Sequence, residues 1–148
     1  MTFQFDGDLV PEGALDYFEA NPNVLVVEDD RFMGQVFLEM LSDVGFNVIR
    51  AANGVTALKK LREEKIDFVI LDILLPAMNG FEIYEKIQED PNIKGIPVMM
   101  VTAWADSLHL SKAAQMGINH FLAKPFTEDE LLEEILALLV DSGSKKMT

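Results

Sequence analysis

Four short stretches of continuous apolar residues constrain the fold of this chain more than any other feature. They are Val24–Val27, Phe68–Leu71, Val98–Val101 and Phe121–Ala123. Strands buried on both faces of a parallel sheet are continuously apolar, whereas strands with one face in water alternate. A polar side chain directly follows each stretch: Glu28, Asp72, Thr102 and Lys124. The pattern predicts one parallel sheet whose strands end in polar groups.

Segments with helical spacing of apolar residues separate these stretches. One begins near Met33 and stops at Gly45, and the last begins at a capping box formed by Thr127 and Glu130. A further strand is predicted at Phe46–Ala51. Five strand–helix pairs with short connections predict an α/β fold, a doubly wound five-stranded parallel sheet in a three-layer sandwich. Such a sheet binds ligands outside the carboxyl ends of its strands.

The composition divides the chain into three parts. Residues 1–22 form an acidic N-terminal extension without Lys or Arg, residues 23–140 form the α/β domain, and residues 141–148 form a polar C-terminal tail. The extension has two open interpretations. It is either a disordered leader or a segment whose Leu15 and Phe18 pack on the domain or on a partner.

Charge and cysteine content exclude several functional classes. The 148 residues carry 25 acidic and 12 basic side chains, a net charge of −13, which repels nucleic acids and anionic membranes. The chain has no cysteine, so disulfides and thiolate metal sites are excluded. No apolar run approaches the ~18 residues of a membrane helix, and the N-terminus lacks the features of a signal peptide. We therefore expect a cytoplasmic protein that binds neither nucleic acid nor membrane.

The residues predicted at the strand ends suit phosphoryl transfer. Glu28, Asp29 and Asp72 would repel one another without a cation, and Mg²⁺ is the hard ion that favours a few carboxylate oxygens. Asp72 can then attack phosphorus as a nucleophile. The Lys124 ammonium and the Thr102 hydroxyl would stabilise the phosphoryl oxygens.

Four motifs resemble those of the response regulator receiver domains of two-component signalling. They are Val24–Asp30, Ile70–Gly80, Met100–Ala103 and Phe121–Phe126. The resemblance spans about residues 23–140 and implies the strand order 2-1-3-4-5 that this family shares with flavodoxin. It implies that Asp72 is the phospho-acceptor and that Thr102 and Lys124 assist the transfer.

The resemblance also implies a set of Mg²⁺ ligands. Asp29 and Asp72 are implied as direct ligands, the Leu74 backbone carbonyl as a third, and Glu28 as a ligand that acts directly or through water. Asp30 lies just past the paired acidic positions. We predict that it caps the first helix.

Switching and partners follow from the same resemblance. Thr102 and Phe121 are implied as the switch pair, and Phe121 excludes any read-out that needs a tyrosine hydroxyl. The implied phosphodonor is a sensor histidine kinase or a histidine phosphotransfer protein. The implied target-binding face consists of the helix near 108–116, the strand at 121–123 and the last helix.

Three functional hypotheses remain open on the sequence. The leading one is a phospho-accepting signalling domain rather than an enzyme, either a stand-alone regulator or the receiver piece of a longer multidomain regulator. The second is an Asp-dependent phosphatase, but those enzymes carry an aspartate where this chain has Leu74. The third is a receiver-like fold that binds partners without phosphorylation, which the complete set of acidic, hydroxyl and ammonium groups argues against.

Two positions near the predicted acceptor carry large apolar side chains. Leu74 follows Asp72 by two residues, and Trp104 follows Thr102 by two. Both are expected at the rim of the site, where they would exclude water and slow the loss of the phosphoryl group. The alternatives are neutral surface variation and an outward-turned Trp104 that contacts a partner. The two histidines, His109 and His120, are interpreted as ordinary helix and strand residues.

Overall fold

The computed structural model describes residues 4–5, 8–9 and 21–146 of the chain. The two interpretations of the N-terminal extension, including the packing of Leu15 and Phe18, concern residues outside these ranges. Two short strands, β1 (Gln4–Phe5) and β2 (Asp8–Leu9), pair antiparallel. Within the described ranges no helix is long and apolar enough to cross a membrane.

A five-stranded sheet forms the centre of the domain. Its strands are β3 (Asn23–Val27), β4 (Asn47–Ala51), β5 (Phe68–Leu71), β6 (Val98–Thr102) and β7 (Phe121–Ala123). They lie in the order β4-β3-β5-β6-β7, and every pair is parallel. Numbered within this sheet, the order is 2-1-3-4-5, so the predicted doubly wound topology is confirmed.

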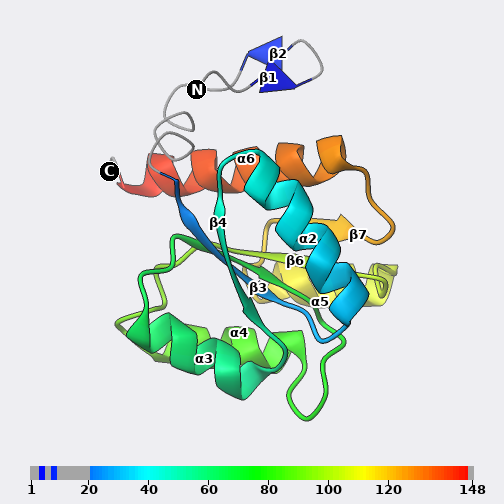
Figure 1. The fold of residues 1–148 in the computed structure, drawn as a ribbon. Coiled ribbons are helices and arrows are strands. Elements are labelled where there is room, and N and C mark those ends of the chain that lie inside the picture. The colour runs from blue at the N-terminus through cyan, green and yellow to red at the C-terminus, as the bar shows by residue number, and fades with distance from the viewer. Residues whose placement is uncertain (1–3, 6–7, 10–20, 147–148) are drawn as a thin grey trace.

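Within residues 21–146, five helices cover the two faces of the sheet. They are α2 (Arg31–Asp43), α3 (Gly54–Glu63), α4 (Gly80–Glu89), α5 (Ser107–Gln115) and α6 (Glu128–Lys146). Figure 1 shows α2 and α6 on one face and α3 and α4 on the other. Two separate apolar clusters fill the layers between helices and sheet, and α5 joins the α3–α4 side through buried Ala113. The three-layer sandwich is therefore confirmed.

Polar side chains at the helix starts explain why the helices begin where they do. Asp30 accepts hydrogen bonds from the Phe32 and Met33 backbone N–H groups, which confirms it as the cap of the first helix after β3. Thr127 and Glu130 exchange hydrogen bonds with each other's backbone N–H groups, so the predicted capping box is present. These caps orient the helices whose loops surround the strand ends.

The last helix is longer than the sequence suggested. It continues to Lys146, so most of the segment predicted as a polar tail after residue 140 is helical. Asp141 accepts from His120, with 2.6 Å between Oδ2 and Nε2, and Glu134 lies 3.3 Å from the other ring nitrogen. Because His120 directly precedes β7, the contact with Asp141 ties α6 to the edge strand of the sheet at a point past residue 140, where the helix was predicted to end.

Gly80 is required where α4 begins against the end of β5. A Cβ at this position would overlap the Asp72 carbonyl oxygen and lie 2.8 Å from the Ile73 Cα. We expect Gly80→Ala to lower the free energy of unfolding by about 1–3 kcal/mol, because backbone rather than a flexible side chain has to move. Urea denaturation measures the change. Gly95→Ala is the control, because nothing lies within 4 Å of its Cβ position, and an equal loss there would contradict this explanation.

Candidate phosphoryl-acceptor site

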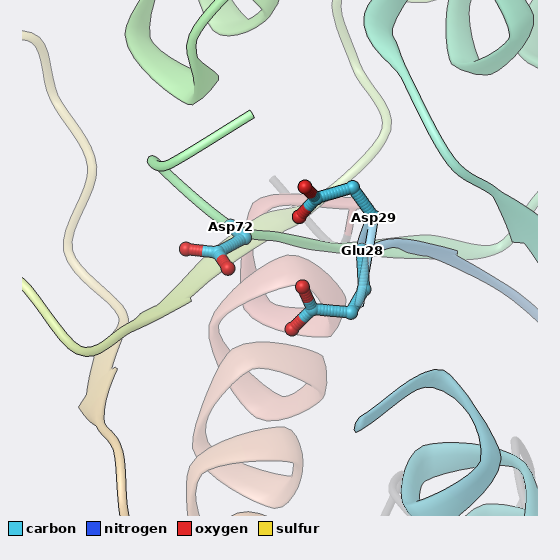
Figure 2. Close-up of side chains that lie close together, drawn as sticks. All are labelled: Glu28, Asp29 and Asp72. Carbon is cyan, nitrogen blue, oxygen red and sulfur yellow. The ribbon is translucent and has the colours of Figure 1, made fainter. Parts of the chain in front are cut away.

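Three carboxylates meet where two neighbouring strands end. Val27 of β3 pairs with Leu71 of β5, so the residues that follow them emerge side by side at the same edge of the sheet. One carboxylate oxygen from each of Glu28, Asp29 and Asp72 lies within 4.8 Å of the others. Figure 2 shows the three side chains together at this edge. The convergence predicted from the strand ends is therefore present.

The three carboxylates differ in burial and in their partners. Glu28 and Asp72 are 3% and 6% exposed, whereas Asp29 is open to solvent. The Lys124 ammonium contacts a Glu28 oxygen and lies 2.9 Å from Asp72 Oδ2. Lys124 thus joins the end of β7 to the ends of β3 and β5. This pairing of Lys124 with Glu28 was not evident from the sequence.

The pKa values of Glu28 and Lys124 are both raised, but for different reasons. Burial raises the pKa of Glu28, and the nearby Asp72 charge adds to the rise, while the Lys124 hydrogen bond only partly offsets it. Burial alone would lower the pKa of Lys124, but its hydrogen bonds and charge interactions with Glu28 and Asp72 outweigh burial and raise it. Lys124 therefore stays a cation at neutral pH, facing the two buried carboxyl groups.

Backbone N–H groups in the loops after β5 and β6 donate hydrogen bonds to the side chains of Asp72 and Thr102. The Leu74 N–H donates to Asp72 Oδ1 at 3.2 Å, so the loop after β5 fixes the orientation of that carboxylate. Thr102 is the last residue of β6 and is fully buried. Its hydroxyl oxygen accepts a hydrogen bond from the backbone N–H of Trp104 at 3.1 Å. The Lys124 N–H also donates to the Thr102 carbonyl at 2.9 Å. The ends of β6 and β7, which carry the Thr102 hydroxyl and the Lys124 ammonium, therefore lie side by side.

A hollow of about 530 Å³ lies open above these strand ends. Its lining residues are Glu28, Asp29, Asp30, Asp72, Leu74, Leu75, Pro76, Ala103 and Lys124. The two predicted switch residues are not part of this lining. Phe121 is half-buried, packs against the apolar cluster on the α3–α4 side, and pairs with Met100 of β6.

Trp104 does not cover this hollow. It is 47% exposed and lines a second hollow of about 500 Å³, next to His109, Phe81 and Lys112. Leu74 lines both hollows. The structure therefore places Leu74 at the rim of the hollow that contains Asp72, as the sequence predicted, and places Trp104 at the neighbouring hollow instead.

The chemistry of the donor set fits a hard divalent cation. The converging ligands are carboxylate oxygens from three side chains, with no sulfur or imidazole among them. Mg²⁺ takes oxygen ligands from one or two carboxylates and retains several waters, which suits a hollow open to solvent. The predicted carbonyl ligand, Leu74, belongs to the same hollow.

Comparisons with known proteins agree with this site. A family model for the response regulator receiver domain matches residues 24–136. Chemotaxis protein CheY-3 of Vibrio cholerae is 37% identical over 116 residues, which are 78% of this chain and 89% of that protein. The polar-differentiation response regulator DivK of Brucella anthropi is 31% identical over 120 residues, which are 81% of this chain and 98% of that protein.

Solved structures show the same fold. A CheY-like receiver domain protein of Methanospirillum hungatei superposes with a TM-score of 0.76 at 27% identity, covering 84% of this chain and 98% of that one. The receiver domain of a Pseudomonas aeruginosa sensor histidine kinase, solved with magnesium coordinated in its active site cleft, gives 0.74 at 28% identity, covering 80% and 98%. The chain belongs to the response regulator receiver domain family, the phospho-accepting domains of two-component signalling.

Proposed function

We propose that this receiver accepts a phosphoryl group on Asp72 from a phosphohistidine, in a reaction that requires Mg²⁺. The observation that carries the proposal is the position of Asp72. Its carboxylate ends a central strand, lies in an open hollow, and is held by Lys124 on one oxygen and by the Leu74 N–H on the other. We further propose that residues 23–140 form the receiver unit, which the match over residues 24–136 supports.

The transfer is a substitution at phosphorus. A carboxylate oxygen of Asp72 forms the new P–O bond while the P–N bond to the donor histidine breaks, and the released imidazole keeps the electron pair and takes up a proton. Lys124 is near enough to balance charge on the phosphoryl oxygens, because its ammonium already lies 2.9 Å from Asp72 Oδ2. The Thr102 hydroxyl can donate to another of these oxygens once its side chain turns toward them.

Glu28, Asp29 and Asp72, with the Leu74 carbonyl, would hold the Mg²⁺ ion. When bound, the ion supplies positive charge that offsets the negative charge of the phosphoryl oxygens and of the carboxylates. Asp29 is the most accessible of the three side chains, so it can engage a hydrated ion at the mouth of the hollow.

The surface that changes on phosphorylation would lie beyond Thr102 and Phe121, on the side away from Asp72. Thr102 pairs with Ala123, and Met100 with Phe121, so we expect a movement of the Thr102 hydroxyl to reach Phe121 across the β6–β7 pair. We propose that the face formed by α5, β7 and α6 then binds a downstream protein. The phosphodonor would be a sensor histidine kinase or a histidine phosphotransfer protein in the cytoplasm. The chain would act as a signalling domain rather than as an enzyme on external substrates.

Intact-mass analysis tests the proposed function. The full chain is incubated with acetyl phosphate and Mg²⁺, and in parallel with acetyl phosphate and a chelator. We expect the mass of one phosphoryl group to be gained only with Mg²⁺. No gain in either sample, with the fold verified by circular dichroism, would contradict the proposal. Sustained release of phosphate from small phosphate esters would instead favour the phosphatase hypothesis.

Lys124→Ala should separate metal binding from switching. Removing the ammonium that contacts Glu28 and Asp72 removes a cation that competes for their oxygens. We expect Mg²⁺ to bind at least about tenfold more tightly, measured by calorimetric titration, since ~1.4 kcal/mol of repulsion suffices for that factor. The fold should stay intact, and the NMR response of Phe121 to phosphorylation should be lost.

Lys112→Ala is the matched control for this variant. The Lys112 ammonium lies over the Phe81 ring, 4.7 Å from its centroid, and lines the second hollow instead of the one with Asp72. Its removal should change neither Mg²⁺ affinity nor the Phe121 response. An unchanged affinity in Lys124→Ala would show that the ammonium does not oppose the metal.

A further inference from the structure

The Trp104 indole is one of three neighbouring rings in the second hollow, with those of His109 and Phe81. The centroid of the Trp104 indole lies 5.1 Å from that of the His109 imidazole. On the Phe81 side, the imidazole lies nearly parallel to the phenyl ring, with 6.3 Å between centroids and 3° between planes. His109 is itself fixed, because its Nδ1 lies 2.8 Å from Asp106 Oδ1 and 2.9 Å from Oδ2. The imidazole therefore has little freedom to rotate.

The stack is connected to the acceptor site through the backbone of Trp104. The Trp104 backbone N–H donates to the Thr102 hydroxyl oxygen at 3.1 Å, so the backbone that carries the indole is hydrogen-bonded to the fully buried Thr102 side chain. Leu74 is 40% exposed and lines both hollows. Leu74 is thus the apolar surface that links the indole's hollow to the one containing Asp72.

We propose that His109 is a positioning residue that keeps the Trp104 indole clear of the approach to Asp72; the inference rests on the proposed function. Trp104 is 47% exposed, and its ring contact with His109 is an aromatic pair of the kind that stabilises one position of the indole. Without the imidazole, the indole would be free to move onto the exposed Leu74 side chain, which lines both its own hollow and the one that contains Asp72.

This movement would slow two reactions together. During transfer the leaving atom of the phosphodonor lies opposite the Asp72 oxygen across phosphorus, and the water that later removes the phosphoryl group attacks from that same side. An indole over Leu74 obstructs that shared approach. Aromatic contacts of this strength correspond to rate changes of about two- to tenfold. His109 would therefore set the speed at which the receiver gains and loses its phosphoryl group without touching the reacting atoms.

The test combines rates with the emission of Trp104, the single tryptophan of the chain. Full-length His109→Ala is phosphorylated with acetyl phosphate and Mg²⁺, and the mass of the protein is followed during gain and, after removal of the donor, during decay. We expect both rates to fall by about two- to tenfold. The emission maximum should move to shorter wavelength and acrylamide quenching should weaken, because the indole becomes more covered.

The double variant shows whether the effect passes through the indole. Trp104→Ala alone, and Trp104→Ala combined with His109→Ala, should both react at the wild-type rates, because no indole is left to obstruct the approach. His109→Phe should restore the wild-type rates, since a phenyl ring can replace the imidazole in the stack. Leu110→Ala, an exposed neighbour on α5 that does not line the second hollow, is the control and should change nothing.

Several outcomes would overturn the inference. Unchanged rates in His109→Ala, or a double variant as slow as His109→Ala, would show that the imidazole does not act by holding Trp104. Unchanged emission in His109→Ala would show that the indole does not depend on it, whether or not the chain is phosphorylated. By contrast, a wild-type chain that gains no phosphoryl group would contradict the proposed function and leave the emission result to decide the role of His109.

Discussion

Asp72→Asn is expected to abolish the Mg²⁺-dependent gain of a phosphoryl group. The asparagine keeps the shape of the side chain, and its amide oxygen can still accept from the Leu74 N–H that now donates to Asp72 Oδ1. What it loses is the anionic oxygen that attacks phosphorus, because a neutral amide is a very poor nucleophile. The expected result is complete loss of the mass increase after treatment with acetyl phosphate and Mg²⁺.

The loss in Asp72→Asn should not come from unfolding. The variant removes one of two buried negative charges, and the Lys124 ammonium keeps Glu28 as a partner. Circular dichroism and thermal unfolding should therefore show a folded domain. Asp43→Asn at the exposed end of α2 is the matched control and should be phosphorylated like the wild type. A mass gain in Asp72→Asn equal to that of the control would place the acceptor elsewhere.

The carboxylate cluster was predictable because parallel strands force their ends together. Glu28 and Asp72 directly follow apolar runs, and runs of that kind become neighbouring strands whose last residues share one edge of the sheet. The same reasoning brings Lys124 to that edge from β7. Hydrophobic periodicity and the position of polar residues along the chain were sufficient for this part of the site.

Side-chain direction in the loops was not predictable in this way. Trp104 lies two residues beyond a strand, where no periodicity sets the direction of a side chain. Its position depends on a stack with His109 and Phe81, and the latter lies more than twenty residues earlier in the chain. The length of α6 was missed for a similar reason, because Asp141 is held by His120 across the domain. Such contacts leave no local signal in the sequence.

The phosphorylated form is expected to lose its phosphoryl group slowly, and Leu74 is the cause. Hydrolysis requires a water aligned opposite the Asp72 oxygen, and a polar side chain at the rim of the hollow can orient it. Leu74 lines that hollow, and its side chain offers no hydrogen bond to water. One water-positioning contact is worth about 1–2 kcal/mol in the transition state. Leu74→Asn, which introduces such a contact, should therefore accelerate decay by about five- to thirtyfold.

We expect Leu74, and not Trp104, to account for the slow decay. Because Trp104 lines the neighbouring hollow and not the one with Asp72, Trp104→Glu should leave the decay rate close to that of the wild type. The double variant should decay like Leu74→Asn alone. The decay is followed by intact mass and by phosphate release, with Mg²⁺ affinity measured in each variant to exclude a change at the metal. Equal decay in Leu74→Asn and wild type, at equal Mg²⁺ affinity, would show that water access at position 74 does not limit hydrolysis.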